Sequence, residues 1–138
     1  MKKVISLLLI VLAVTGFSFA TGQAEKTTTP AAGAKFHIGV ATGTVSQSED
    51  DLRGAERLIQ EYGSVANGGM IQHVTYPDNF MQEMETTISQ ILGLSDDPLM
   101  KAIVVNQAIP GTTEAFRKVR ERRPDILLIA GEPHEDPL

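Results

Sequence analysis

The sequence predicts an α/β fold, a doubly wound parallel sheet with four strands in the order 2-1-3-4. Two observations predict it. Short apolar runs of strand length alternate along the chain with segments whose apolar residues recur at helical spacing. The last two runs, 101–106 and 125–131, are too uniformly apolar to have a wet face, which is typical of parallel strands covered by helices on both sides.

The first strand and helix are predicted within residues 36–63. The segment FHIGVATG at 36–43 is a nearly continuous apolar run of strand length. Ser48 and Asp51 then have the spacing of a capping box, so we expect the helix to begin there. Apolar residues follow at helical spacing until Gly63, at Leu52, Ala55, Leu58, Ile59 and Tyr62.

The second strand, MIQHVTY at 70–76, is more polar than the others, which favours an edge position in the sheet. Asn79 and Gln82 form a second capping pair, and Gly93 is a stop signal, so a helix is expected over 79–93. Its apolar stripe is predicted to face the core, at Met81, Met84, Ile88, Ile91 and Leu92.

The third strand is predicted at 101–106 and the fourth at 125–131, with a helix between them. Pro110 suits the first turn of this helix, and its cationic end before Pro124 complements the helix dipole. An edge position for strand 2 places strands 1 and 3 side by side in the middle of the sheet. The switch point, where ligands bind in such sheets, then lies between those two strands.

The amino-terminal residues have the organisation of a secretory signal peptide. Lys2 and Lys3 precede an apolar run at 4–14, and Ser18-Phe19-Ala20 provides the small residues of a cleavage site after Ala20. Residues 21–35 are expected to form a flexible leader, and 36–138 the partial amino-terminal lobe of a solute-binding domain. The predicted location is periplasmic or secreted, with no membrane insertion after signal removal.

The net charge and the cysteine content restrict the possible binding partners and covalent linkages of the protein. Removal of Lys2 and Lys3 changes the formal net charge from −5 to −7, because two positive charges are lost. An acidic protein of this kind is a poor partner for nucleic acid or for anionic membrane surfaces. The sequence contains no cysteine, which excludes disulfides and the lipid anchor of a lipoprotein signal.

Neutral hydrogen-bonding side chains and an aromatic ring follow the predicted strands, where ligands bind in doubly wound sheets. This mixture suits a small polar solute, uncharged or weakly charged, held by amides and hydroxyls and stacked on a ring. No cofactor is predicted. The candidate ligand-binding residues are Thr42, Thr44, Ser46, Gln47, Tyr76, Asp78, Asn79, Asn106, Gln107 and Glu132.

Nucleotide and phosphoacceptor readings fit less well. Gly39 and Gly43 lie four residues apart and no third glycine follows, so the dinucleotide fingerprint is absent, and no Gly-Lys-Ser/Thr ends the loop as in a P-loop. The acidic run at 49–51 disfavours a phosphate at the start of the first helix. A receiver domain would need acidic residues where Thr42 and Asn106 stand.

The histidines carry no defensible metal motif, so no metal site is predicted. His37 is expected to be a satisfied core or flanking residue, and His73 to lie on the edge strand. His134 follows the fourth strand beside Glu132, Glu135 and Asp136. An acid-base role there is an alternative, although a solvated loop is favoured and no nucleophile with a neighbouring base is evident.

The signal peptide, the leader, and the segments YPDN, KAIVVNQA and PDILLIAGEP together resemble the amino-terminal lobe of type I periplasmic solute-binding proteins. Longer stretches, from IGVATGTVSQSEDDLRGAE to the end, more closely resemble an uncharacterised bacterial family of secreted proteins of that fold, catalogued as a domain of unknown function. The resemblance implies a two-lobed protein that traps solute by hinge closure, of which this chain carries an apparently truncated first lobe.

The resemblance implies an extracytoplasmic solute-binding protein, not an enzyme, that delivers a sugar-like or nucleoside-like solute to an ABC permease. Two alternatives stay open. The same fold can pass ligand closure to a membrane partner as a sensory receptor. A hydrolase or isomerase would use His134 and its neighbouring carboxylates.

Overall fold

The computed structural model describes residues 33–135 of the 138-residue chain. The predicted signal peptide at 1–20 and most of the predicted leader at 21–35 therefore lie outside the described residues. Strands and helices alternate, with one short 3-10 helix, η1. Their bounds are β1 His37–Thr42, α2 Val45–Tyr62, η1 Val65–Asn67, β2 Ile71–Thr75, α3 Met84–Leu94, β3 Met100–Val105, α4 Thr112–Arg122 and β4 Leu127–Ala130.

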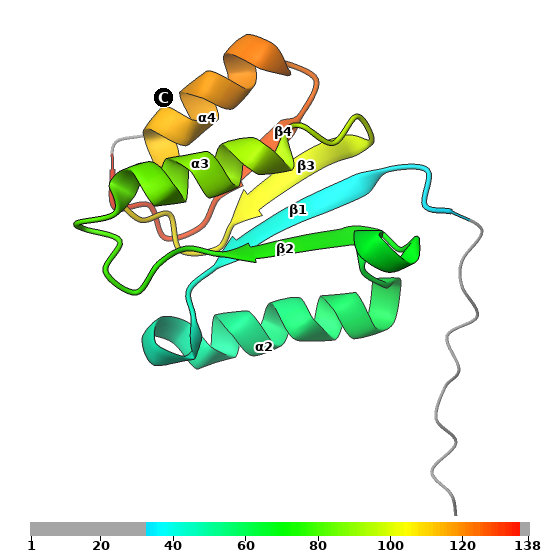
Figure 1. Ribbon diagram of the computed structural model, residues 1–138, viewed down its shortest axis with the longest axis horizontal. Coiled ribbons are helices and arrows are strands. Elements are labelled where there is room, and N and C mark those ends of the chain that lie inside the picture. The colour runs from blue at the N-terminus through cyan, green and yellow to red at the C-terminus, as the bar shows by residue number, and fades with distance from the viewer. Residues whose placement is uncertain (1–32, 136–138) are drawn as a thin grey trace, which may run out of the picture.

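The strands form one parallel sheet in the order β2-β1-β3-β4, which confirms the predicted order and the α/β fold class. Helix α2 lies on one face of the sheet, and α3 and α4 lie on the other (Figure 1). Because all strands run in the same direction, their carboxyl ends lie at the same end of the sheet, which we call the carboxyl edge. The loops that follow β1 and β3 meet at that edge, at the switch point.

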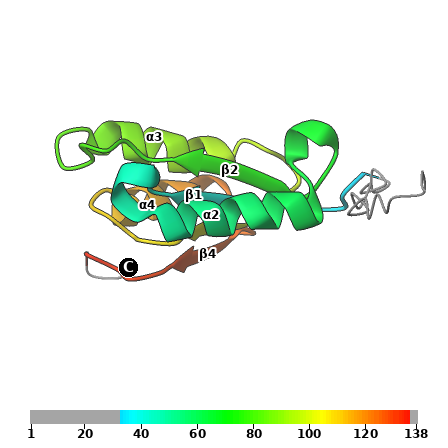
Figure 2. The ribbon, with the colours of Figure 1, turned by 90° about the horizontal axis from the view of Figure 1, so that it is seen from below.

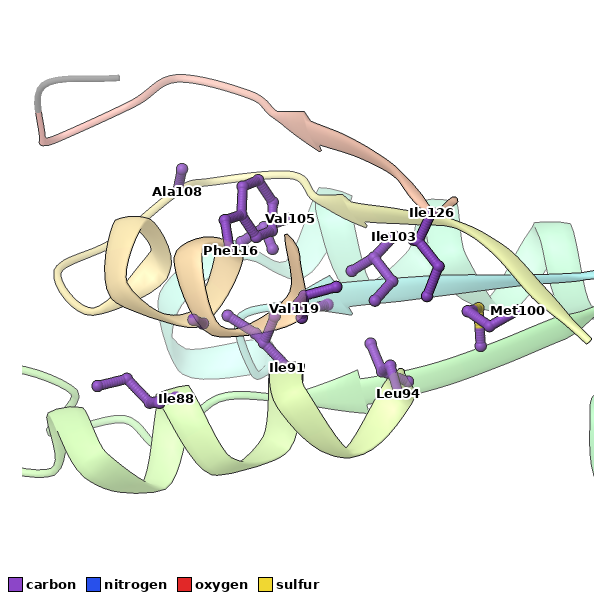
Figure 3. Close-up of a cluster of buried hydrophobic side chains, with 12 residues drawn as sticks. Ile88, Ile91, Leu94, Met100, Ile103, Val105, Ala108, Phe116, Val119 and Ile126 are labelled. Carbon is purple, nitrogen blue, oxygen red and sulfur yellow. The ribbon is translucent and has the colours of Figure 1, made fainter. Parts of the chain in front are cut away.

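Most of the core lies between the sheet and the helices α3 and α4 (Figure 3). Side chains of α3, α4 and β3 interdigitate there, with Ile91 of α3 and Val119 of α4 directed toward Ile103 of β3. The buried members of this cluster are Ala41, Ile88, Ile91, Leu94, Met100, Ile103, Val105, Ala108, Ala115, Phe116, Val119 and Ile126. This packed layer is the rigid support for the loops at the carboxyl edge.

The opposite face has a smaller core. Val40 of β1, Ala55 of α2 and Ile71 of β2 form its buried cluster, and Ala55 is the only buried residue of α2. Helix α2 therefore packs over β1 and β2, and it leaves β3 and β4 to one side (Figure 2).

A polar cluster closes the amino end of the sheet around the connector between α3 and β3. The Arg123 guanidinium donates through Nη1 to the carbonyls of Ser95 and Asp97, both at 3.0 Å, and through Nη2 to the carbonyl of Met100 at 3.1 Å. The Asp97 carboxylate lies 2.5 Å from Nδ1 of His37. His37 is thus a satisfied residue on the first strand, as predicted.

The predicted start of the first helix lies at a kink inside α2, where two helical segments meet at Ser48. The helix begins at Val45 with Thr44 as its cap, and Ser48 interrupts it with non-helical dihedral angles (φ −153°, ψ 85°). The Ser48 N–H donates to the carbonyl of Thr44 at 3.0 Å, and the Asp51 carboxylate turns toward the sheet instead of toward Ser48. A capping box is a local pattern, and here a long-range contact of Asp51 prevails over it.

The second helix starts later than predicted. The Asn79 carbonyl accepts from the N–H groups of Gln82 and Glu83, which closes a single turn, and α3 begins only at Met84. Met81 and Met84 are 61% and 38% exposed, so their predicted place in the core was wrong. Starting the helix at Met84 shifts the buried stripe to Thr87, Ile88, Ile91 and Leu94.

The fourth strand also departs from the prediction. Leu127 and Ile129 are 61% and 42% exposed, whereas a strand covered by helices on both sides was expected. Within residues 33–135, α4 covers one face of β4 and no helix covers the other. The uniformly apolar sequence of β4 correctly predicts a parallel strand, but its second face is open here.

Candidate functional site

The loops after β1 and β2 are joined by hydrogen bonds at the carboxyl edge of the sheet. The Thr44 hydroxyl donates to the Asp78 carboxylate and lies 2.9 Å from the Ser46 hydroxyl. The Gln47 amide donates to the Asp78 carbonyl at 2.5 Å. Hydrogen bonds from Thr44 and Ser46 lower the pKa of Asp78, so this carboxylate is ionised at neutral pH. Four predicted site residues thus form one polar cluster.

Tyr76 connects this cluster to the loop after β3. Its hydroxyl donates to the Gln107 side-chain oxygen at 3.3 Å, and its ring packs edge-to-face on Phe80 at 6.2 Å between centroids. Burial, reinforced by the negative charge of Asp51, raises the pKa of Tyr76 to about 12. The phenol therefore remains a neutral hydrogen-bond donor throughout the physiological pH range.

Asn106 and Asp51 bridge the switch point. The Asn106 Nδ2 group donates to the Asp51 carboxylate at 2.6 Å, which ties the start of α2 to the end of β3. Sequence reasoning assigned Asp51 to the helix start and so missed it as a site residue. Gly131 lies against the same loop, and a Cβ atom there would stand only 2.2 Å from the Asn106 carbonyl oxygen.

Thr42 lies under the site. Its side chain is buried, and its hydroxyl donates to the Gly43 carbonyl at 2.9 Å. Nε2 of His73 lies 2.9 Å from the Thr42 hydroxyl oxygen. Because that hydroxyl has a single hydrogen, His73 is the donor in the second contact. His73 is on the edge strand as predicted, but its contact with Thr42 was not foreseen.

We expect the stability of the domain to fall in mild acid because of His73. Burial lowers its pKa, so the folded state binds fewer protons than the unfolded chain. The cost of protonating His73 in the folded state is absent above the unfolded pKa of about 6.5 and develops as the pH falls from that value through the lower folded pKa. Urea unfolding of the native chain and of His73→Gln between about pH 5 and pH 7 measures it. If the free energy of unfolding changed equally with pH in both proteins, this role of His73 would be contradicted.

Three predicted positions remain apart from these clusters. The side chains of Asn79 and Glu132 make no hydrogen bond within residues 33–135, and Glu132 has a left-handed backbone (φ 41°). His134 is exposed, and its backbone N–H donates to the Ala108 carbonyl at 3.0 Å. Glu135 instead accepts from the N–H groups of Gly111 and Thr113, both at 3.1 Å, and so caps α4. Asp136 lies outside the described residues.

Within residues 33–135, no group of three or more histidine and carboxylate side chains is arranged to hold a metal ion. No helix in the same range has the length and the apolar character needed to cross a membrane.

A model of the family described as "Protein of unknown function (DUF3798)" matches residues 36–138. The chain belongs to the DUF3798 family. This agrees with the predicted likeness to an uncharacterised bacterial family, and it brings no assigned ligand or reaction with it.

Relatives in Treponema pallidum (strain Nichols) are described only as "Uncharacterized protein". One is 50% identical over 104 residues, which cover 74% of this chain and 47% of the relative. Another is 53% identical over 45 residues, 33% of this chain and 21% of the relative. The chain therefore spans less than half the length of either relative.

Among solved structures, the chain is similar to the crystal structure of a protein from Clostridium difficile 630, titled "Putative transcriptional regulator". The TM-score is 0.59 and the sequence identity is 31%. The match covers 68% of this chain but only 28% of the solved chain. The matched region is thus a minor part of the solved chain.

Proposed function

We propose that this chain supplies one side of the cleft of an extracytoplasmic solute-binding protein, of the type I periplasmic kind. The single observation that carries the proposal is the convergence of polar side chains on the switch point. Thr44 and Asp78 come from the loops after β1 and β2, Gln47 comes from the first turn of α2, and Asn106 and Gln107 directly follow β3. A binding role is favoured over catalysis because these groups hydrogen-bond to one another, and the Thr42 hydroxyl, which contacts His73, is buried beneath them.

The charges at the carboxyl edge limit the class of solute that could bind there. The four segments that follow the strands, 42–51, 76–84, 106–111 and 131–135, contain seven carboxylates and neither lysine nor arginine. Phosphate or carboxylate groups would be repelled there, whereas hydroxyl, amide and ammonium donors would be attracted. We therefore propose a neutral or cationic polar solute, such as a sugar, a nucleoside or an amine.

The proposed setting is that of an importer. A signal peptide at 1–20 would take the chain out of the cytoplasm, and an ABC permease would receive the solute. A second lobe would close over the cleft, since a site open on one side buries too little of a solute for tight binding. The matches cover only 47% of one relative and 28% of the solved chain, which supports the proposal that this chain forms only part of the cleft.

Solute titrations followed by amide NMR shifts test the proposal on the chain itself. Neutral, cationic and anionic solutes would be added to millimolar concentration, because a half-open cleft is expected to bind weakly. We expect shifts at residues 42–47, 76–78 and 106–107 for a neutral or cationic solute. In a complete two-lobed relative the same solute should stabilise the protein by about 2–4 kcal/mol at saturation. A broad panel that shifts none of these amides would overturn the proposal.

Asn106→Ala should weaken solute binding about tenfold, because it removes the amide that bridges to Asp51 and leaves that carboxylate without its donor. Asn67→Ala is the matched control, since Asn67 is an exposed asparagine of η1 at the other end of the sheet. Titrations of both variants give the comparison. Equal affinity in the two variants would remove Asn106 from the site.

A further inference from the structure

The two faces of the sheet are covered unequally. Neighbouring strands lie about 4.8 Å apart and packed helices about 8–10 Å apart, so one helix covers about two strands. A sheet of four strands therefore needs two helices on each face. The pair α3 and α4 meets this need on one face, but within residues 33–135 only α2 lies on the other (Figure 2).

The uncovered strip is apolar. Ala102 pairs in register with Leu127, and Val104 with Ile129, and these side chains share the face on which α2 lies. Leu127 is 61% exposed and Ile129 is 42% exposed. We call these four residues the open strip. An apolar surface of this kind on a parallel sheet is normally covered.

A groove beside α2 reaches the open strip at Val104, the one member of the strip that lines it. It has a volume of about 650 Å³, and Leu58 and Tyr62 of α2, 38% and 46% exposed, form its outer wall. Val104 lies on its floor, and Asp51 and Asn106 lie at the carboxyl end of the sheet. The groove is thus apolar along its length and polar where it reaches the switch point.

A helix that directly follows β4 would not cover the open strip. Parallel crossovers are right-handed, so a connection from β4 to a strand added beside it places its helix on the face of α4. Such a connection has the same sense as the one from β3 to β4, whose helix is α4. The open strip therefore needs a segment that reaches the sheet by another route.

We infer that the open strip is the contact surface for an additional helix, packed alongside α2, that the longer relatives supply from outside the matched region. The chain covers only 47% of one relative and 28% of the solved chain, so sufficient length exists to provide it. The helix presents an apolar stripe to the open strip, to Leu58 and to Tyr62. Its end near the switch point lies beside Asp51 and Asn106. This inference does not depend on solute binding.

Thiol labelling at Leu127 tests the inference directly, because the chain has no cysteine of its own. Leu127→Cys in this chain should react with a thiol reagent at the rate of an exposed cysteine. A cysteine at the aligned position of the Treponema pallidum relative that is 50% identical should react at least about tenfold more slowly, with the labelled peptide identified by mass spectrometry. Asn67→Cys, exposed in η1, is the control and should react equally fast in both proteins.

Three results would overturn the inference. Equally fast labelling at position 127 in both proteins would show that no helix covers the strip. Slow labelling of Leu127→Cys in this chain, together with the mass of a dimer, would show that a second copy of the chain covers the open strip. Faster labelling after deletion of residues 1–32 would identify that segment as the cover. Should the cysteine variant of the relative not fold, hydrogen exchange of its native β4 amides, compared with those of this chain, gives the same decision.

Discussion

Replacing Ile103 by alanine should destabilise the domain by about 2–5 kcal/mol, a large part of the total stability of a domain this size. Ile103 is 0% exposed, lies on a central strand between β1 and β4, and packs against α3 and α4. The substitution removes three carbons and leaves a cavity, because neighbours drawn from several elements cannot all collapse into it. Equilibrium urea unfolding measures the loss as a lower midpoint at an unchanged slope.

Leu127→Ala is the matched control for Ile103→Ala. Both residues are large and apolar and lie on neighbouring strands, but Leu127 is 61% exposed on the open strip. Its replacement should change the stability of this chain by less than about 1 kcal/mol. Similar losses for both variants would contradict the assignment of the main core to the side of α3 and α4.

Replacing Gly131 by alanine should cost about 1–3 kcal/mol through overpacking. The new Cβ atom would lie 2.2 Å from the backbone oxygen of Asn106. Gly131 cannot retreat freely, because its N–H donates to Val105 at 2.9 Å and its carbonyl accepts from Ala108 at 2.8 Å. We therefore expect the loop at Asn106 to shift, visible as NMR shift changes at residues 106–108, together with a lower urea midpoint.

Gly54→Ala makes the same chemical change where there is room. A Cβ atom at Gly54 meets no atom within 4 Å, and the residue lies inside α2. Alanine is the better helix former, so this variant should be more stable by about 0.5–1 kcal/mol. Opposite signs for the two glycine variants are the expected outcome, and a stabilising Gly131→Ala would show that the Asn106 loop is not tightly packed.

The apolar pattern of the strands allowed the fold to be predicted. Each strand lies within two residues of its predicted range, and the polar residues Gln72 and His73 correctly placed the second strand at an edge. Helix starts were less predictable. Asp51 and Asn79 both stand at positions typical of caps, yet one bonds across to Asn106 and the other closes a separate turn.

The candidate site was predictable in position but not in its pairings. Most of the predicted residues lie at the carboxyl edge, because parallel strands bring their following loops together. Asp51 and His73 were missed, since each matched a local structural role. Asp51 bonds to a residue 55 positions away and His73 to one 31 positions away, and no local pattern contains such contacts.

The sequence by itself determined the four strands, their order and the loops available at the carboxyl edge, because periodicity and local composition decide which backbone segments can be buried. Only the tertiary structure decided which side chains meet at that edge, since Asp51 and Asn106, or Thr44 and Asp78, approach one another only when the helices pack on the sheet. It also decided that β4 keeps one apolar face open. An apolar run indicates that a strand is suited to burial, whereas the helix that buries it must come from another part of the fold.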